Sequence, residues 1–158
     1  MLVGARRATS ADVPSITLLY RDLEEEQAAL RSLWPLADGV DEPIDDSFAA
    51  ILDDPDSMLV VGSIDHVILG FCWMRVEPLL SQAKDRVVAV SRLIHTVAEA
   101  RGVGIGDAML TLAMDEMRAR GIALFDARVS PGHRNAKNFY EAHGFSARLI
   151  IMHHDDDV

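Results

Sequence analysis

The segment Arg86–Arg120 constrains the fold of this chain more than any other stretch. It begins with a run rich in β-branched residues (86–97), passes a turn with glycines at positions 102, 104 and 106, and ends in an amphipathic stretch (105–120) closed by Gly121. A strand, a glycine turn and a helix in this order gather unpaired backbone N–H groups at the positive end of the helix dipole. We therefore expect a phosphate-binding turn over residues 101–106, where Arg101 could add charge-assisted hydrogen bonds.

Two familiar phosphate-binding loops do not match this turn. The dinucleotide fingerprint G-x-G-x-x-G needs a small residue where Asp107 stands, and the P-loop needs a Gly-Lys-Ser/Thr ending that the chain lacks. Asp107 suits the first turn of a helix, although it would repel phosphate if it faced the loop. A nucleotide-binding enzyme that uses NAD or ATP is therefore a disfavoured interpretation.

A second motif, HRNAKNFYEAHGF, covers residues 133–145. We expect a short helix over 135–143 that stops at Gly144, with Phe145 beginning another strand.

Together the two segments resemble the hallmarks of the GNAT superfamily, the acyl-CoA-dependent N-acetyltransferases. Residues 101–106 resemble its R/Q-x-x-G-x-G/A signature, and residues 94–101 resemble its lead-in strand, with Thr96 in place of valine and Ala98 in place of proline. Residues 133–145 resemble the second hallmark, N-x-x-A-x-x-F/L-Y-E-x-x-G-F. Both motifs occur in the family's order and at about its spacing.

The resemblance implies an α/β (α+β) GNAT fold in one domain, residues 1–158. Its mixed, mostly antiparallel sheet would have about seven strands with helices on both faces. The strands ending at Val97 and Val129 would splay apart to admit the pantetheine arm of acetyl-CoA. The implied cofactor contacts are the backbone of Ile94, His95 and Thr96 for the arm, and Arg101, Gly102, Val103, Gly104, Ile105 and Gly106 for the pyrophosphate.

The resemblance also implies that Tyr140 is the acid that protonates the departing CoA thiolate. A phenol of pKa about 10 lies close enough to a thiol of about 8.5 for such a transfer; the alternative is that Tyr140 only packs beside Phe139. The family's usual asparagine position holds His133, and Asn135 follows two residues later. Either could contact the pantetheine arm, or His133 could be an exposed loop residue. No metal site is expected.

No general base stands out. Alternation along the strand places Val88, Val90, Arg92, Ile94 and Thr96 on one face and His95 on the other. Arginine cannot give up its proton at ordinary pH. We therefore favour a water chain that ends at a backbone carbonyl or an acidic loop residue, with His95 as the second choice.

The rest of the chain predicts alternating elements. Expected strands cover 3–9, 58–64, 67–76 and 122–129, and expected helices cover 12–33 and 46–52. Trp34-Pro35 is expected to end the first helix. Cys72 lies in an apolar run and is expected to pack as a small hydrophobic side chain.

Charge is unevenly distributed in a chain whose net charge is −10. Residues 22–57 are strongly acidic and residues 101–148 are mildly basic. This favours a cationic small amine or a basic peptide end as acceptor, although solvated acidic faces explain the pattern equally well. The chain shows no basic stripe with interleaved aromatics, no signal-peptide core and no membrane span, so we expect no nucleic acid or membrane partner and a cytoplasmic location. The sequence leaves open a homodimer formed through an edge strand.

The sequence therefore predicts an N-acetyltransferase that transfers the acetyl group of acetyl-CoA to a primary amine. The alternative from another class is a non-catalytic acyl-CoA sensor or interaction module, which the missing base would favour.

Overall fold

A computed structural model of the chain describes residues 1–30, 38–130 and 132–158. The strands are β1 (Val3–Arg7), β2 (Ser57–Ile64), β3 (Val67–Pro78), β4 (Val87–Thr96) and β5 (Phe125–Ala127). The helices are α1 (Val13–Ala29), α3 (Ile44–Asp53), α4 (Ile105–Ala119) and α5 (Arg134–Ala142), with short 3-10 turns at Ser10–Asp12, Ser81–Ala83 and Ala98–Ala100. The expected end of the first helix at Trp34-Pro35 lies outside the described residues.

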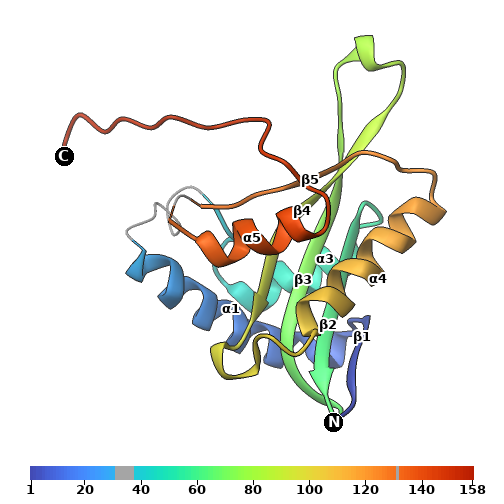
Figure 1. Cartoon of the computed structure of the whole chain (residues 1–158), viewed down its shortest axis with the longest axis vertical. Helices are drawn as coiled ribbons and strands as arrows, with labels where there is room; N and C mark the ends of the chain where they lie inside the picture. The colour runs from blue at the N-terminus through green and yellow to red at the C-terminus, as the bar shows by residue number, and fades with distance from the viewer. Residues whose placement is uncertain (31–37, 131) are drawn as a thin grey trace.

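The strands form one mixed sheet in the order β1-β2-β3-β4-β5. Neighbours from β1 to β4 are antiparallel, and β5 runs parallel to β4. The parallel pair follows from the connection through α4, which returns the chain to the edge of the sheet (Figure 1). This arrangement confirms the expected mixed, mostly antiparallel sheet.

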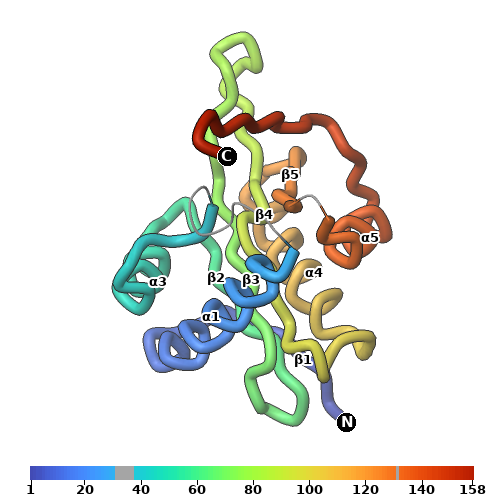
Figure 2. The backbone as a smooth tube through the Cα atoms, turned by 90° about the vertical axis from the view of Figure 1, so that its left-hand side faces the viewer, coloured from blue at the N-terminus to red at the C-terminus, as the bar shows by residue number. Residues whose placement is uncertain are grey.

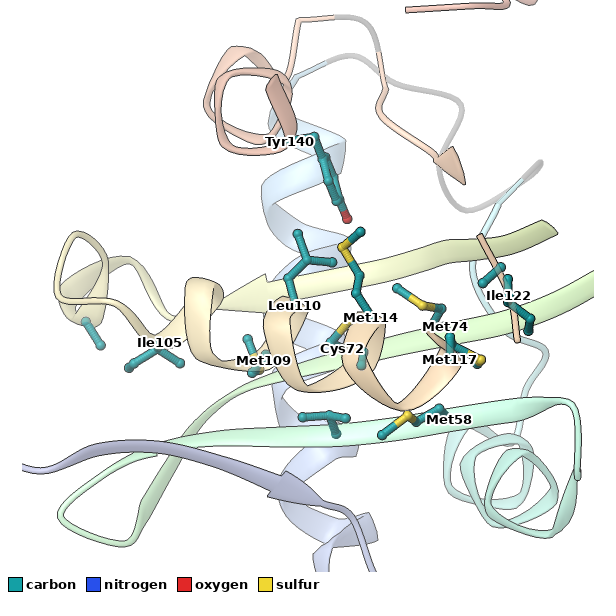
Figure 3. Close-up of a cluster of buried hydrophobic side chains, with 14 residues drawn as sticks. Met58, Cys72, Met74, Ile105, Met109, Leu110, Met114, Met117, Ile122 and Tyr140 are labelled. Carbon is teal, nitrogen blue, oxygen red and sulfur yellow. The ribbon is translucent and has the colours of Figure 1, made fainter. Parts of the chain in front are cut away.

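Helices cover both faces of the sheet (Figure 2). On one face, α1 and α3 pack through Ile16, Leu23 and Phe48 against Phe71 and other strand residues. On the other face, the methionine-rich side of α4 packs against β2, β3 and β4, and Tyr140 of α5 joins this second core (Figure 3). None of the helices in the described residues is long and apolar enough to cross a membrane.

The expectation of about seven strands is not met, because the described residues form five. No strand follows α5, so the strand expected to begin at Phe145 is absent from residues 145–158. β5 is only three residues long and offers little edge for pairing. The side chains of Leu149–Met152 stay 70–87% exposed, while an ion pair between Arg148 and Asp126 holds the start of this tail beside β5.

A β-bulge interrupts β4. Trp73 lies opposite Leu93, but the next residue, Met74, lies opposite Ser91, so Arg92 is the extra residue on β4. A bulge reverses the alternation of side chains beyond it. The expectation that His95 and Arg92 face opposite sides of the sheet is therefore wrong. The Arg92 guanidinium lies over Trp73 in the core under α1 and α3, and His95 hydrogen bonds to α1.

Candidate functional site

The site begins where β4 and β5 part. The two strands pair only along Ala89–Ser91 on β4. Two flanking bonds run from the Ala89 N–H to the Leu124 carbonyl at 2.9 Å and from the Arg128 N–H to the Ser91 carbonyl at 3.1 Å. Among the described residues, Leu93–Thr96 have backbone partners on β3 but none on β5. The end of β4 predicted to bind a pantetheine arm thus presents an unpaired edge, as a splayed pair of strands requires.

The glycine turn lies directly after this edge. Gly102 and Gly104 have positive φ of 85° and 101°, and open space surrounds the position that a Cβ would take at either. Gly104 caps α4, whose first N–H groups have no partner within the helix. The carboxylate of Asp107 pairs with Nε2 of His143, the residue after α5, at 3.0 Å. It is therefore directed toward the end of α5 rather than into the turn.

Gly106 serves packing as well as the turn. A Cβ there would lie 3.0 Å from the ring of Phe139 on α5. The small residue therefore allows α5 to approach the N-terminus of α4, which sets the position of Tyr140 next to Phe139.

Arg101 is directed toward α1 rather than into the turn. Its guanidinium donates to both oxygens of Glu26, at 3.0 and 2.6 Å, and its Nε donates to the Thr96 carbonyl at 2.9 Å. The hydrogen bonds with Arg101 lower the pKa of Glu26, and partial burial opposes them. The Arg101 guanidinium, predicted to bind phosphate, is therefore already paired with a carboxylate.

Glu26 also lies between two histidines. Its carboxylate is 3.5 Å from Nδ1 of His95 and 3.6 Å from Nε2 of His133. His95 is buried and places its Nε2 2.7 Å from Oδ2 of Asp22, a side chain that is 50% exposed. Asp22 and Glu26 are one helical turn apart on α1, so one face of this helix brings both carboxylates to the end of β4.

His133 and Asn135 lie at the start of α5 and have different surroundings. Nδ1 of His133 is 2.9 Å from the Gln27 side-chain nitrogen, and His133 is the N-cap residue of α5. Burial lowers the pKa of His133, Glu26 opposes this effect, and Arg101 lowers the pKa further. A neutral imidazole then accepts the Gln27 hydrogen bond at Nδ1. Asn135 is exposed.

Tyr140 reaches from α5 into the α4-side core, where Figure 3 shows its hydroxyl directed toward the strands. The hydroxyl oxygen is 2.7 Å from Oγ of Ser91, the last β4 residue paired with β5. Burial raises the pKa of Tyr140 far above its ordinary value, and the nearby Cys72 raises it further. Cys72 is buried, which confirms the packing expected for it.

The acidic segment does not gather into one surface. Glu42 pairs with Arg21, Asp54 with Arg75, and Asp38 lies 4.0 Å from Arg128. Asp45 and Asp46 lie in the first turn of α3, where the helix dipole favours them. Local structure therefore accounts for much of the charge asymmetry.

The sequence analysis missed Ser91, Asp22 and Glu26. The four-residue spacing of Asp22 and Glu26 marked a shared helical face, but nothing in the sequence identified His95 and Arg101 as their partners. No group of His, Cys, Asp and Glu side chains suited to a metal ion is found within residues 1–30, 38–130 and 132–158.

Comparison with known proteins agrees with this geometry. The model of the Acetyltransferase (GNAT) family matches residues 20–145. No curated protein matches the chain.

Solved structures match the fold over nearly the whole chain. A transcriptional regulator from Bacillus halodurans C-125 is 24% identical with a TM-score of 0.76, and the match covers 97% of this chain and 100% of that chain. A predicted acetyltransferase from Clostridium acetobutylicum, solved with acetyl-CoA, is 15% identical with a TM-score of 0.76, over 98% of this chain and 96% of that one. AAC(6')-Iy, solved with the bisubstrate analog CoA-S-monomethyl-acetylneamine, is 15% identical with a TM-score of 0.77, over 98% and 99% of the two chains.

The matched family model spans both sequence motifs, the unpaired edge of β4 and Tyr140, and the chain therefore belongs to the Acetyltransferase (GNAT) family.

Proposed function

We propose that this acetyltransferase moves the acetyl group from acetyl-CoA to a primary amine by direct attack. The observation that carries the proposal is the position of the glycine turn at the unpaired end of β4, with the Tyr140 hydroxyl bonded to Ser91 where β4 leaves β5. The family match and the acetyl-CoA complex of the Clostridium acetobutylicum structure support the cofactor.

In this proposal the cofactor takes the place of a missing strand. The backbone of residues 94–96 would bond the pantetheine arm as one strand bonds another. The pyrophosphate would lie against the N–H groups of residues 102–106 at the N-terminus of α4. Arg101 would act by fixing the turn to α1 through Glu26, and His133 would hold the start of α5 against Gln27.

Tyr140 would protonate the departing thiolate. Its raised pKa keeps the phenol protonated at every ordinary pH, so the donor form is always present. Burial likewise raises the pKa of the neighbouring Cys72 thiol to about 12, so these surroundings disfavour a thiolate. A CoA thiolate that departs beside Tyr140 would lose hydration there, which favours its protonation.

The Asp22–His95 pair would accept the proton of the amine. The bulge at Arg92 brings His95 to the α1 side of the sheet, and Asp22 links its buried ring to solvent. A half-exposed carboxylate bonded to an imidazole can take a proton and pass it to water. This pair therefore replaces the water chain that the sequence alone favoured.

Ligand-induced stabilisation tests the cofactor. Acetyl-CoA or CoA at a hundred times its Kd should stabilise the protein by about 2.7 kcal/mol, whereas ATP and NAD should leave the melting temperature unchanged. A shift with ATP or NAD alone would contradict the proposal.

Substitution of Tyr140 separates an enzyme from a non-catalytic sensor. Tyr140→Phe keeps the buried ring and removes the hydroxyl, so kcat for CoA release should fall about a hundredfold while acetyl-CoA binding persists. Thiol release measures the rate, and the acetyl-CoA thermal shift measures binding. An unchanged kcat would remove Tyr140 from the mechanism, and a wild-type protein that binds acetyl-CoA without acetylating any amine would be a sensor.

A further inference from the structure

We infer that the acceptor carries a carboxylate besides its amine, and that Arg92 and Arg128 bind this carboxylate; the inference rests on the proposed function. The sequence favoured a cationic small amine or a basic peptide end as acceptor, and these two arginines add a carboxylate to that expectation.

Both arginines adjoin the proposed site of chemistry. Arg92 follows Ser91 directly, and the Arg128 N–H donates to the Ser91 carbonyl at 3.1 Å. Ser91 in turn holds the Tyr140 hydroxyl at 2.7 Å. The backbone of both arginines is therefore joined directly to the residue that holds the Tyr140 hydroxyl.

The arginines lie on the side of the sheet that the acceptor would approach. The bulge directs Arg92 toward the α1 and α3 face, where its guanidinium lies 4.9 Å from the centre of the Trp73 ring. Asp38, in the connection from α1 to α3, lies 4.0 Å from Arg128. His95, whose pair with Asp22 is proposed to accept the proton of the amine, faces the same side of the sheet as Arg92.

The two cations have too few acceptors in the described part of the chain. Glu77 is the one carboxylate in the described residues that lies within 4 Å of both guanidinium groups. One of its oxygens is 3.2 Å from Arg92 and the other is 3.8 Å from Arg128. Arg128 has no side-chain hydrogen bond among the described residues, since its approaches to Glu77 and Asp38 are 3.8 and 4.0 Å. Its side chain is 49% exposed, so its N–H donors face solvent.

The proximity of the cations is itself unfavourable. Burial lowers the pKa of Arg92, and the charge of Arg128 lowers it further. A bound anion would relieve this repulsion, and the planar fork of a guanidinium matches the two oxygens of a carboxylate. Arg92 is already oriented by Trp73 and Glu77, so little side-chain freedom would be lost on binding.

The test compares acceptors that differ only in this group. CoA release is measured for each common L-amino acid and for its carboxamide, in wild-type protein, Arg128→Gln and Arg86→Gln. Arg86 is an exposed arginine in the connection between β3 and β4, and it controls for the loss of one positive charge. The thermal shift with acetyl-CoA is recorded for each variant.

We expect the best amino acid to exceed its carboxamide about tenfold to a hundredfold in kcat/KM, through KM. Arg128→Gln should remove most of this preference, because it should lower kcat/KM for the amino acid far more than for the carboxamide. Arg86→Gln should leave both rates and the acetyl-CoA shift unchanged. Equal kcat/KM for acids and carboxamides, or an equal loss of kcat/KM for both in Arg128→Gln, would overturn the inference. Neither result would contradict the proposed acetyltransferase activity. No acetylation of any amine would overturn the proposed function, and the inference with it.

Discussion

His95 shows how a residue acquires a role from partners distant in the sequence. Its ring is bonded to Asp22 and lies near Glu26, both on α1, while its own backbone belongs to β4. The glycine turn, by contrast, was predictable because its signal lies within a few consecutive residues. The acids on α1 could not be assigned from the sequence, because their partners lie more than sixty residues away.

Substitution of His95 tests whether this residue accepts the proton of the amine. His95→Gln should lower kcat for a strongly basic alkylamine about a hundredfold, because the ammonium ion must lose its proton before attack. A weakly basic arylamine, already neutral at pH 7, should lose little. Steady-state rates for the two amines, with Glu25→Gln as an exposed control on the same helix, measure the difference. Equal losses for both amines would indicate that His95 only supports the structure.

The local hydrophobic pattern of the sequence predicted most helices and strands. The remaining features depend on how the strands pair in the sheet. The helix beginning at Ile105 and the hairpin of β2 and β3 lie where their hydrophobic periods indicate. The bulge in β4 depends on register against β3, which no single strand encodes. The strand expected over 122–129 is limited to Phe125–Ala127, because only these residues pair with β4, over Ala89–Ser91.

A glycine pair tests the contact that joins β2 to the start of α4. A Cβ at Gly62 would lie 2.5 Å from Ile105 and 2.8 Å from Met109, whereas a Cβ at Gly4 on the neighbouring strand would meet nothing within 4 Å. Gly62→Ala should therefore lower the free energy of unfolding by about 1–3 kcal/mol. Gly4→Ala should change it by less than about 0.5 kcal/mol.

Urea denaturation measures both glycine variants. Because Ile105 begins α4, Gly62→Ala should also weaken the acetyl-CoA thermal shift if the helix moves. Equal unfolding free energies for the two variants would show that the sheet and α4 adjust freely, contrary to the close packing of this face.

The molecule as a whole buries ionisable groups on the α4 side of its sheet. Burial raises the pKa of the Cys72 thiol from 9.0 to about 12. An unfolded chain therefore ionises this thiol first, so its contribution to stability is complete below pH 9 and is lost as the pH rises toward 12.

Denaturation midpoints at pH 7.5 and pH 9.5 test this linkage. The wild-type free energy of unfolding should fall between the two pH values, and the fall should be smaller in Cys72→Ala, which has no thiol to ionise. Cys72→Ala should lower stability at both pH values because packing is lost. The quantity compared between the two proteins is therefore the change in unfolding free energy from pH 7.5 to pH 9.5. An identical decrease in both proteins would mean that other groups control the alkaline transition.

The single extra residue at Arg92 also affects how relatives of this protein are compared. A homologue with an uninterrupted strand would present the opposite set of side chains to each layer beyond this point, although its residues would align without a gap over most of β4. If the acceptor-pocket residues of such a homologue were assigned from the alignment alone, pocket residues would be matched with core residues beyond this point. Formation or loss of this bulge at constant chain length would therefore change which side chains face the acceptor, while the fold stays the same.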